Sequence, residues 1–220
     1  MKAEQLSDEL RRLHNYLAKD TQPLWHPDIM LDAHNYKAWM MACAAFTQDK
    51  EALAKYGMRP GRGVLLTGPS GVGKSHIFIL LQKYLNHVDR NQPLAFTKAQ
   101  TVQYAYADTT NGGNAALSRI ANKKHTNGLL VNQVFDDILA ERPTKHFQEQ
   151  PVYALPELIT MREELFTSKG VLTHFTANYR SERIREVYGD RVLSRLLWMC
   201  DVIVFTDKAT DWRAFNPLQV

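Results

Sequence analysis

The segment that most constrains this chain is glycine-rich, GPSGVGKS, at positions 68–75. It fits the pattern G-x-x-x-x-G-K-[ST] at every fixed position. The apolar run GVLLT precedes it and HIFILLQKYL follows it, so the local order is strand, loop and helix. Glycines let such a loop curl until successive N–H groups point at anionic oxygens, and the helix aims its positive end at the same place. The segment therefore predicts a site for the phosphates of a nucleoside triphosphate.

The lysine and the serine that end this loop have separate expected roles. The Lys74 ammonium neutralises charge on the β- and γ-phosphates, and the Ser75 hydroxyl is a ligand for Mg²⁺. We expect the whole loop and the first residue after it to contact the nucleotide. The predicted nucleotide-binding residues are Gly68, Pro69, Ser70, Gly71, Val72, Gly73, Lys74, Ser75 and His76.

Around the loop, short aliphatic runs alternate with helical stretches, the pattern of β-α-β units and of a parallel sheet covered on both faces. The expected strands are residues 63–67, 94–98, 129–135, 171–176 and 202–206. The expected helices are residues 1–20, 36–54, 74–87, 156–168 and 181–199, with a mixed region at 101–120. The predicted fold is α/β: a three-layer P-loop NTPase sandwich around a five-stranded, mostly parallel sheet.

The composition excludes several other classes of protein. Hydrophobic residues make up 45% and charged residues 23% of the 220 positions, as in globular domains rather than disordered or fibrous chains. The net charge of +4 is mildly basic, but too weak to indicate a nucleic-acid partner by itself. No apolar run approaches the ~20 residues of a membrane span, and no signal peptide is visible. Two cysteines, Cys43 and Cys200, are too few for a disulfide framework, so we expect a cytoplasmic protein.

Residues 1–30 are expected to form a helical arm ahead of a domain that covers residues 31–220. Leucines recur there at helical spacing, at Leu6, Leu10, Leu13 and Leu17. This spacing predicts one amphipathic helix. Two interpretations stay open at this point: a helix docked on the domain, or an arm that binds a partner protein.

Two consecutive acids are candidates for the chemistry that a P-loop requires on a neighbouring strand. Asp136 and Asp137 end the run LLVNQVF, and ligands of parallel sheets bind at the carboxyl ends of the strands. We expect Asp136 to hold Mg²⁺ through water, and Asp137 to orient or deprotonate the attacking water. The competing interpretation is an exposed acidic turn, which the presence of the P-loop makes less favoured.

Further polar residues follow the later strands. The run VLTHFTANY ends in Asn178, whose amide can hold the lytic water or sense the γ-phosphate, although a loop asparagine is as often a cap or turn residue. Arg191 and Arg195 lie four residues apart on one helix face, and Arg213 follows the last strand. A guanidinium can stabilise a phosphoryl transition state, but spacing alone favours ordinary surface ion pairs for each of these arginines.

In order along the chain, the segments GPSGVGKS, FDDILAE, THFTANY, YGDRVLSRL and DWR resemble those of the AAA+ ATPases of the DnaC helicase-loader and IstB transposition-helper family. HNYKAW, ahead of the P-loop, also resembles that family, and the likeness covers residues 31–213. The glycine-rich motif is common to all P-loop NTPases, whereas its ordered combination with TANY and GDRVLSRL is much narrower. Because almost nothing follows Arg213, the helical lid domain of larger AAA+ proteins is expected to be absent or vestigial.

The resemblance implies a role for each of the polar residues. Asp136 and Asp137 correspond to the Walker B acids, with an aspartate where many AAA+ proteins have glutamate. Asn178 corresponds to sensor 1, and Arg213 to sensor 2. Arg195 corresponds to the arginine finger, which acts on ATP held by a neighbouring subunit.

The resemblance also implies cofactors and partners. ATP, with its base flanked near Asn35 and Tyr36, and Mg²⁺ are the expected cofactors. In such proteins an extra helix at the position of residues 101–120 faces single-stranded DNA in an assembled ring or spiral. Side chains suited to stacking or phosphate contact there are Tyr104, Tyr106, Arg119, Lys123 and Lys124. The expected partners are further copies of the chain when nucleotide is bound, single-stranded DNA, and a replicative helicase or a transposase.

The predicted function is ATP binding and hydrolysis in DNA replication or mobile-element transposition, as a DnaC-like loader or an IstB-like helper. Hydrolysis is expected to be weak in the monomer and stimulated by DNA or self-association. The alternative is a P-loop enzyme that phosphorylates a small molecule, although no arginine-rich closing lid is visible. An inactive scaffold fits poorly with the intact Lys74, Ser75, Asp136 and Asp137.

Overall fold

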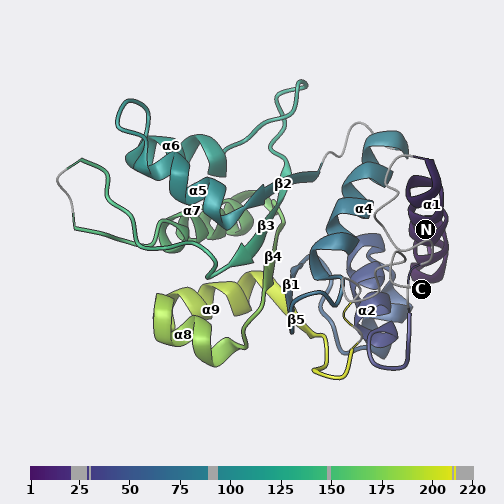
Figure 1. Cartoon of the computed structure of the whole chain (residues 1–220). Coiled ribbons are helices and arrows are strands. Elements are labelled where there is room, and N and C mark those ends of the chain that lie inside the picture. The colour runs from purple at the N-terminus through teal and green to yellow at the C-terminus, as the bar shows by residue number, and fades with distance from the viewer. Residues whose placement is uncertain (21–28, 30, 89–93, 148–149, 210, 212–220) are drawn as a thin grey trace.

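The computed structural model describes residues 1–20, 29, 31–88, 94–147, 150–209 and 211. Its centre is a parallel five-stranded sheet with the strand order β2-β3-β4-β1-β5 (Figure 1). The strands are β1 (Gly63–Thr67), β2 (Leu94–Lys98), β3 (Asn132–Ile138), β4 (Thr173–Ala177) and β5 (Cys200–Val204). The predicted fold class is confirmed. Since every pair is parallel, the carboxyl ends of all strands lie along one edge of the sheet, where ligands of such sheets bind.

Helices cover both faces of this sheet. They are α1 (Ala3–Asp20), α2 (Tyr36–Thr47), α3 (Lys50–Lys55), α4 (Lys74–Val88), α5 (Ala99–Ala107), α6 (Gly113–Ala121), α7 (Leu155–Lys169), α8 (Ser181–Tyr188) and α9 (Asp190–Met199). Helices α1, α2 and α4 lie on one side, and α5 to α9 on the other (Figure 1). Successive side chains of β1 alternate between the two cores: Val64 and Leu66 pack with the first group of helices and Leu65 with the second.

Two helices predicted as continuous are each interrupted. The stretch 36–54 divides at Gln48, which has a left-handed φ of 52°, and at Asp49, whose side chain accepts the Ala52 N–H to begin α3. The stretch 181–199 divides at Gly189, with a φ of 87°. Both halves bury apolar residues on the same side of the sheet. The apolar pattern therefore runs across each break, and periodicity alone does not locate it.

Strand β3 begins and ends three residues later than predicted, and so runs through both acids. The run LLVNQVF contains two polar residues, and the structure shows what each of them binds. Gln133 is fully buried, and its Nε2 donates to the Ala121 carbonyl at the end of α6, at 3.2 Å. Asn132 Oδ1 accepts the Leu172 N–H at 2.9 Å. These polar side chains bind neighbouring main-chain groups, which hydropathy does not reveal.

Helix α1 packs on α2 and α4, and its leucine face contributes to the core on that side (Figure 1). The buried Trp39 indole Nε1 donates to Ser7 Oγ at 2.9 Å. The Ala3 N–H donates to Asp49 Oδ2 at 3.0 Å, which ties the start of α1 to the cap of α3. The helix thus lies on the domain, as the first of the two interpretations has it. The partner-binding role and the division at residue 30 stay predictions.

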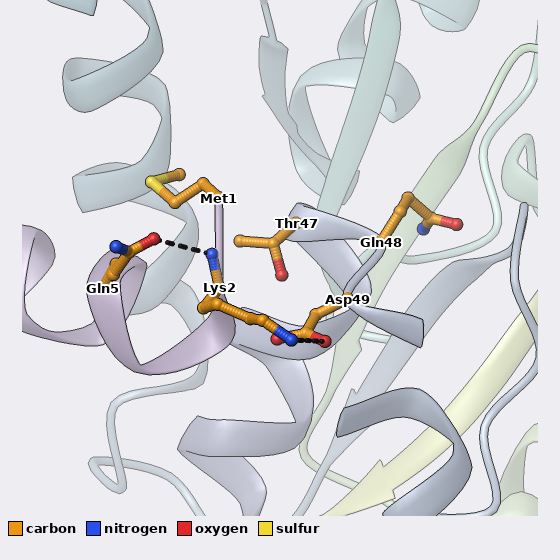
Figure 2. Close-up of a pocket in the computed structure, with 6 residues that line it drawn as sticks. All are labelled: Met1, Lys2, Gln5, Thr47, Gln48 and Asp49. Carbon is orange, nitrogen blue, oxygen red and sulfur yellow. Dashed lines mark hydrogen bonds and ion pairs between the residues drawn. The ribbon is translucent and has the colours of Figure 1, made fainter. Parts of the chain in front are cut away.

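A hollow of about 370 Å³ lies where the start of α1 meets the turn between α2 and α3 (Figure 2). Its lining residues are Met1, Lys2, Gln5, Thr47, Gln48 and Asp49. The Lys2 ammonium is paired there, 2.6 Å from Glu51 Oε2 and 3.7 Å from Asp49 Oδ1. Because none of the predicted site residues lines this hollow, we interpret it as a seam of the α1 docking.

Three absences hold for the part of the chain that the structure describes. None of its helices has the length and apolar character that crossing a bilayer requires. Its His, Cys, Asp and Glu side chains form no cluster of three or more that could hold a metal ion. After Val204, residues 205–209 and 211 contain no helix.

Candidate nucleotide site

The glycine-rich loop connects β1 to α4 at the carboxyl edge of the sheet. Gly68, Gly71 and Gly73 have φ values of 141°, 85° and 94°, which residues other than glycine rarely adopt. A Cβ on Gly68 would lie 2.6 Å from the Phe205 carbonyl oxygen, and one on Gly71 would lie 1.7 Å from Asp211 Oδ1. The main-chain conformation and the close neighbours therefore both require glycine in this loop.

The loop lysine is turned back onto the loop itself. Lys74 is only 5% exposed, and its Nζ donates to the carbonyls of Gly68 at 2.8 Å and Pro69 at 2.5 Å. A third bond, of 2.9 Å, reaches Asn178 Oδ1 just beyond β4. A buried ammonium requires such acceptors, and phosphate oxygens are acceptors of the same kind. The predicted phosphate contact of Lys74 therefore requires a triphosphate to displace these acceptors.

Asn178 links the loop lysine to the second of the two acids. Its Oδ1 accepts from Lys74 and its Nδ2 donates to Asp137 Oδ1 at 2.5 Å. The P-loop, the end of β4 and the end of β3 are therefore joined by one chain of side-chain hydrogen bonds. This geometry favours a site residue over the turn or cap residue that composition alone left open.

Thr176, a residue that sequence reasoning missed, orients both acids. Its hydroxyl donates to Asp136 Oδ1 at 2.8 Å and accepts the Asp137 N–H at 2.7 Å. A threonine inside a buried strand is an ordinary β-former, so only its place next to Asn178 in THFTANY hints at this role. Asp136 is 6% exposed, and its carboxylate and the Ser75 hydroxyl are the hard oxygen donors that Mg²⁺ prefers. The donor set therefore fits a magnesium ion.

The backbone at the acids is strained. Asp137 has a φ of 59° and Leu139 a φ of 73°, and the register between β3 and β4 shifts between Phe135 and Ile138. Left-handed conformations at non-glycine residues cost roughly 1–2 kcal/mol each, and such strain clusters at functional sites. The shift turns Asp137 out of the regular strand alternation, and this places its carboxylate beside Asn178.

Arg195, predicted to act on nucleotide, makes its described ion pair away from this chain of contacts. Arg195 lies on α9, and its Nε is 3.9 Å from Glu163 Oε2 of α7, with both side chains partly exposed. Such a solvent-screened pair is weak. Arg191 is exposed on the same helix. Arg213 lies outside the described residues.

The ring of His76, predicted to contact nucleotide, faces α1. Its Nε2 is 2.8 Å from His14 Nδ1, and the two rings meet edge to face. Burial, followed by the neighbouring imidazole of His14, lowers the pKa of His76 to about 3, so the ring is neutral at physiological pH. A nucleotide contact from His76 would therefore come from its main chain, and that role stays a prediction.

Two residues expected near the base differ in exposure. Asn35 is fully buried at the start of α2, and its Oδ1 accepts the Asp32 N–H at 2.9 Å. Tyr36 is half exposed, at 50%. Its ring is therefore accessible to a base, while the side chain of Asn35 stabilises the turn before α2.

Four of the five side chains proposed to face DNA are exposed. Its accessible members are Tyr104, Arg119, Lys123 and Lys124. Tyr104 is 68% exposed on α5, as a stacking residue requires. The fifth residue was interpreted wrongly: Tyr106 is only 7% exposed, and its ring packs against His146 with centroids 6.0 Å apart. Residues two positions apart on a helix point in nearly opposite directions, so Tyr106 faces the core when Tyr104 faces solvent.

This chain is similar to known proteins in structure but matches none of them by sequence family. No family model matches the sequence, and no curated protein matches it either. The crystal structure of the DnaC helicase loader aligns with a TM-score of 0.53 and 16% identity, over 80% of this chain and 93% of that one. Domain III of the Thermotoga maritima replication initiation protein DnaA aligns with a TM-score of 0.56 and 20% identity, over 82% and 68% of the two chains.

A third similar structure is the replication initiator DnaA bound to AMPPCP and single-stranded DNA. Its TM-score is 0.55 at 15% identity, over 80% of this chain and 48% of that one, so this chain spans about half of its length. The fold is that of the AAA+ P-loop domain. At these identities the similarity shows the fold alone, and the predicted resemblance to DnaC-like proteins is confirmed at that level.

Proposed function

We propose that this chain binds ATP with Mg²⁺ and hydrolyses it, and that it acts on DNA in replication or transposition as a DnaC-like loader or an IstB-like helper. One observation carries the proposal: Lys74, Asn178 and Asp137 form a continuous hydrogen-bonded chain across the carboxyl edge of the sheet. A P-loop that served only as a scaffold would need no such connection to a carboxylate. The connection supports a site in which phosphate binding and water activation are coupled.

Each residue has one task in this proposal. Lys74 exchanges its two loop carbonyls for phosphate oxygens, which places positive charge against the β- and γ-phosphates. Asp137 orients the attacking water and accepts its proton, while Asn178 holds that carboxylate and meets the γ-phosphate. Mg²⁺, held by Ser75 and Asp136, would supply positive charge that offsets the charge developing on the phosphates. Thr176 keeps Asp136 in the orientation this requires.

A complete site would include a residue from another copy of the chain. Arg195 lies on α9 with a third of its side chain exposed, and its only described ion pair is the long one with Glu163. We therefore propose that it reaches ATP held by a neighbouring copy, as the arginine finger does in the family that this sequence resembles. Weak hydrolysis by the isolated chain would follow from this arrangement.

Single-stranded DNA is the proposed ligand of the assembled protein. The exposed Tyr104 ring is suited to stacking on a base, and Arg119, Lys123 and Lys124 to contacting phosphates. The similarity in fold to a DnaA that was solved with AMPPCP and single-stranded DNA supports this choice. The protein partner in this proposal is a replicative helicase or a transposase.

The experiment that tests the function measures nucleotide affinity, ATP turnover with and without single-stranded DNA, and mass in solution with nucleotide. We expect Lys74→Ala to abolish binding, and Asp137→Asn to retain binding but slow hydrolysis. Arg195→Ala should lower turnover and leave ATP affinity near normal. Arg191→Ala is the matched control, because it removes an exposed arginine from the same helix.

Three outcomes would contradict the proposal in different ways. Full hydrolysis by Asp137→Asn would overturn the role of that carboxylate. Equal losses in Arg191→Ala and Arg195→Ala would remove the argument for a finger. ATP consumption that depends on a small metabolite, and not on DNA or association, would favour the alternative of a small-molecule kinase.

A further inference from the structure

The strained turn after the acids is held by two bonds from its main chain to other parts of the protein. The Asp137 N–H donates to Thr176 Oγ1 on β4 at 2.7 Å. The Leu139 N–H donates to the Tyr188 hydroxyl on α8 at 3.1 Å. Both anchored residues have positive φ, so each bond stabilises a conformation that the residue itself disfavours. The position of Asp137 therefore depends on β4 on one side and on α8 on the other.

Tyr188 makes a second bond to the same turn. Its hydroxyl accepts from Leu139 and donates to Glu141 Oε1, so one phenol oxygen connects two points of the chain that follows Asp137. Tyr188 is 8% exposed and Glu141 3% exposed. Burial is the main cause that raises the pKa of Tyr188, and the same cause raises the pKa of Glu141. Glu141 Oε2 has no hydrogen-bond partner among the described residues.

Packing alone does not account for this pair. A phenylalanine would fill the space beside Tyr153, whose ring meets that of Tyr188 edge to face at 5.6 Å. Burying a hydroxyl and a carboxyl costs free energy unless they are hydrogen-bonded, and a pair of apolar side chains would avoid that cost. What these bonds do here is fix the main chain at Leu139, two residues after the candidate catalytic acid.

The other end of the link is the helix pair that carries the proposed finger. Tyr188 is the last residue of α8, and Gly189, with a φ of 87°, leads directly into α9. Arg195 lies on α9, six residues beyond that glycine. A movement of α8 and α9 on assembly would therefore act on the turn at Leu139 through a single hydroxyl.

We propose that Tyr188, with Glu141 as its acceptor, is a positioning residue for ATP hydrolysis: it sets the turn that carries Asp137 and connects it to the helices that carry Arg195. The inference rests on the proposed function and deepens it. Neither residue touches the nucleotide in this account. Their effect is on the orientation of the carboxylate and on how that orientation responds to a neighbouring subunit.

The first test is Tyr188→Phe, which removes the hydroxyl and keeps the ring. We expect kcat for ATP to fall about tenfold and KM and nucleotide affinity to stay within about twofold, because orientation is lost and phosphate binding is kept. Tyr153→Phe is the matched control: it removes a hydroxyl from the adjoining ring and should leave kcat unchanged. Glu141→Gln keeps an acceptor for the phenol, so it should retain more of kcat than Tyr188→Phe does.

A second measurement does not depend on turnover. Hydrogen exchange of the Leu139 amide should become faster in Tyr188→Phe and stay as in the wild type in Tyr153→Phe, with exchange in β1 unchanged. The double variant with Arg195→Ala should lose less kcat than the product of the two single losses, since both act through one coupled arrangement. An active wild type in which Tyr188→Phe alters neither kcat nor Leu139 exchange overturns the positioning role alone. A wild type that hydrolyses no ATP, alone or assembled on DNA, overturns the proposed function and this role with it.

Discussion

The two faces of the sheet bury polar groups in opposite ways. On the face covered by α1, α2 and α4, the His174 ring packs against the rings of Phe46 and Phe78, with centroids 5.2 and 5.6 Å away. On the face covered by α5 to α9, the guanidinium of Arg162 is fully buried. One face therefore holds an imidazole among aromatic rings, while the other holds a guanidinium among main-chain carbonyls.

The charge states of these groups differ for the same physical cause. Burial lowers the pKa of His174 to about 3, so the imidazole is neutral at physiological pH, and its Nδ1 accepts the Val64 N–H at 3.2 Å. Burial also lowers the pKa of Arg162, to about 10, which leaves the guanidinium charged. The imidazole of His174 is therefore buried without charge, whereas the guanidinium of Arg162 keeps its charge and is surrounded by acceptors.

The arrangement around Arg162 explains why the second face tolerates a charge. Its Nε donates to Thr173 Oγ1 at 2.8 Å, and its terminal nitrogens donate to the carbonyls of Ala121 at 2.8 Å and Leu172 at 2.9 Å. These partners belong to the end of α6 and the start of β4, so one side chain of α7 joins three elements. The turn that follows Asp137 is tied to this same face through the bond from the Leu139 N–H to the Tyr188 hydroxyl.

Replacing the buried Arg162 should give the largest change in stability. Arg162→Met keeps most of the side-chain volume but removes the guanidinium donors from three carbonyls and a hydroxyl, so we expect unfolding free energy to fall by about 3–5 kcal/mol. Urea denaturation measures this loss. Arg162→Lys, which keeps the charge but not the planar fork, should recover less than half of it. A variant with methionine that is as stable as the wild type would mean that these bonds contribute nothing net.

The buried neutral imidazole of His174 should instead be detected through the pH dependence of stability. The folded pKa of His174 is about 3 against an ordinary value of 6.5, so the unfolded chain binds more protons between these values. Stability is therefore complete above about pH 6.5 and is lost as the pH falls, by up to about 1.4 kcal/mol per pH unit for each such histidine. His174→Asn keeps an acceptor for the Val64 N–H and cannot be protonated. Its unfolding free energy should decline less steeply in acid, and a slope equal to that of the wild type would contradict the buried neutral imidazole.

The sequence predicted most accurately the strands that adjoin glycine or proline residues. The predicted bounds of β1 and β2 match those observed, because β1 runs directly into the P-loop and a proline immediately precedes β2 in the sequence. The break at Gln48 was missed because the apolar residues of α2 and α3 join the same core, so the apolar pattern continues across it. The late start of β3 was missed because the residues before it pair elsewhere: Leu130 forms an antiparallel bridge with Lys124, and the Val131 N–H donates to the Lys123 carbonyl at 3.1 Å. An apolar run does not tell these two pairings apart.

The candidate site divides in the same way. The meeting of Lys74, Asp137 and Asn178 could be predicted, because the carboxyl ends of parallel strands share one edge. The roles of Thr176 and Tyr188 could not, since they depend on the register shift between β3 and β4 and on the place where α8 ends. Common residue types in ordinary positions give no signal until three-dimensional contacts are known.

A smaller loss of stability is expected where α1 packs on α2 and α4. Ser7→Ala leaves the buried Trp39 indole N–H without its acceptor, which should lower unfolding free energy by about 1–3 kcal/mol. The double variant with Trp39→Phe isolates the hydrogen bond, because it removes donor and acceptor together. If Ser7→Ala costs the same in both backgrounds, the bond has no energetic role and α1 is held by its leucines alone.

The smallest change in stability is expected from Glu141, on the face covered by α5 to α9. Its pH dependence should be opposite to that of His174. Its pKa is raised above the ordinary 4.5, chiefly by burial, so as the pH rises the folded chain releases this proton later than the unfolded chain does. The sign is opposite to that of His174: stability is complete below about pH 4.5 and decreases as the pH rises through the folded pKa. Glu141→Gln does not titrate at this position, so its unfolding free energy should lack this decline while the acid-side loss from the histidines persists. Urea titrations of both chains across this range separate the two slopes, and parallel curves above pH 4.5 would show that Glu141 ionises in the folded protein as it does in water.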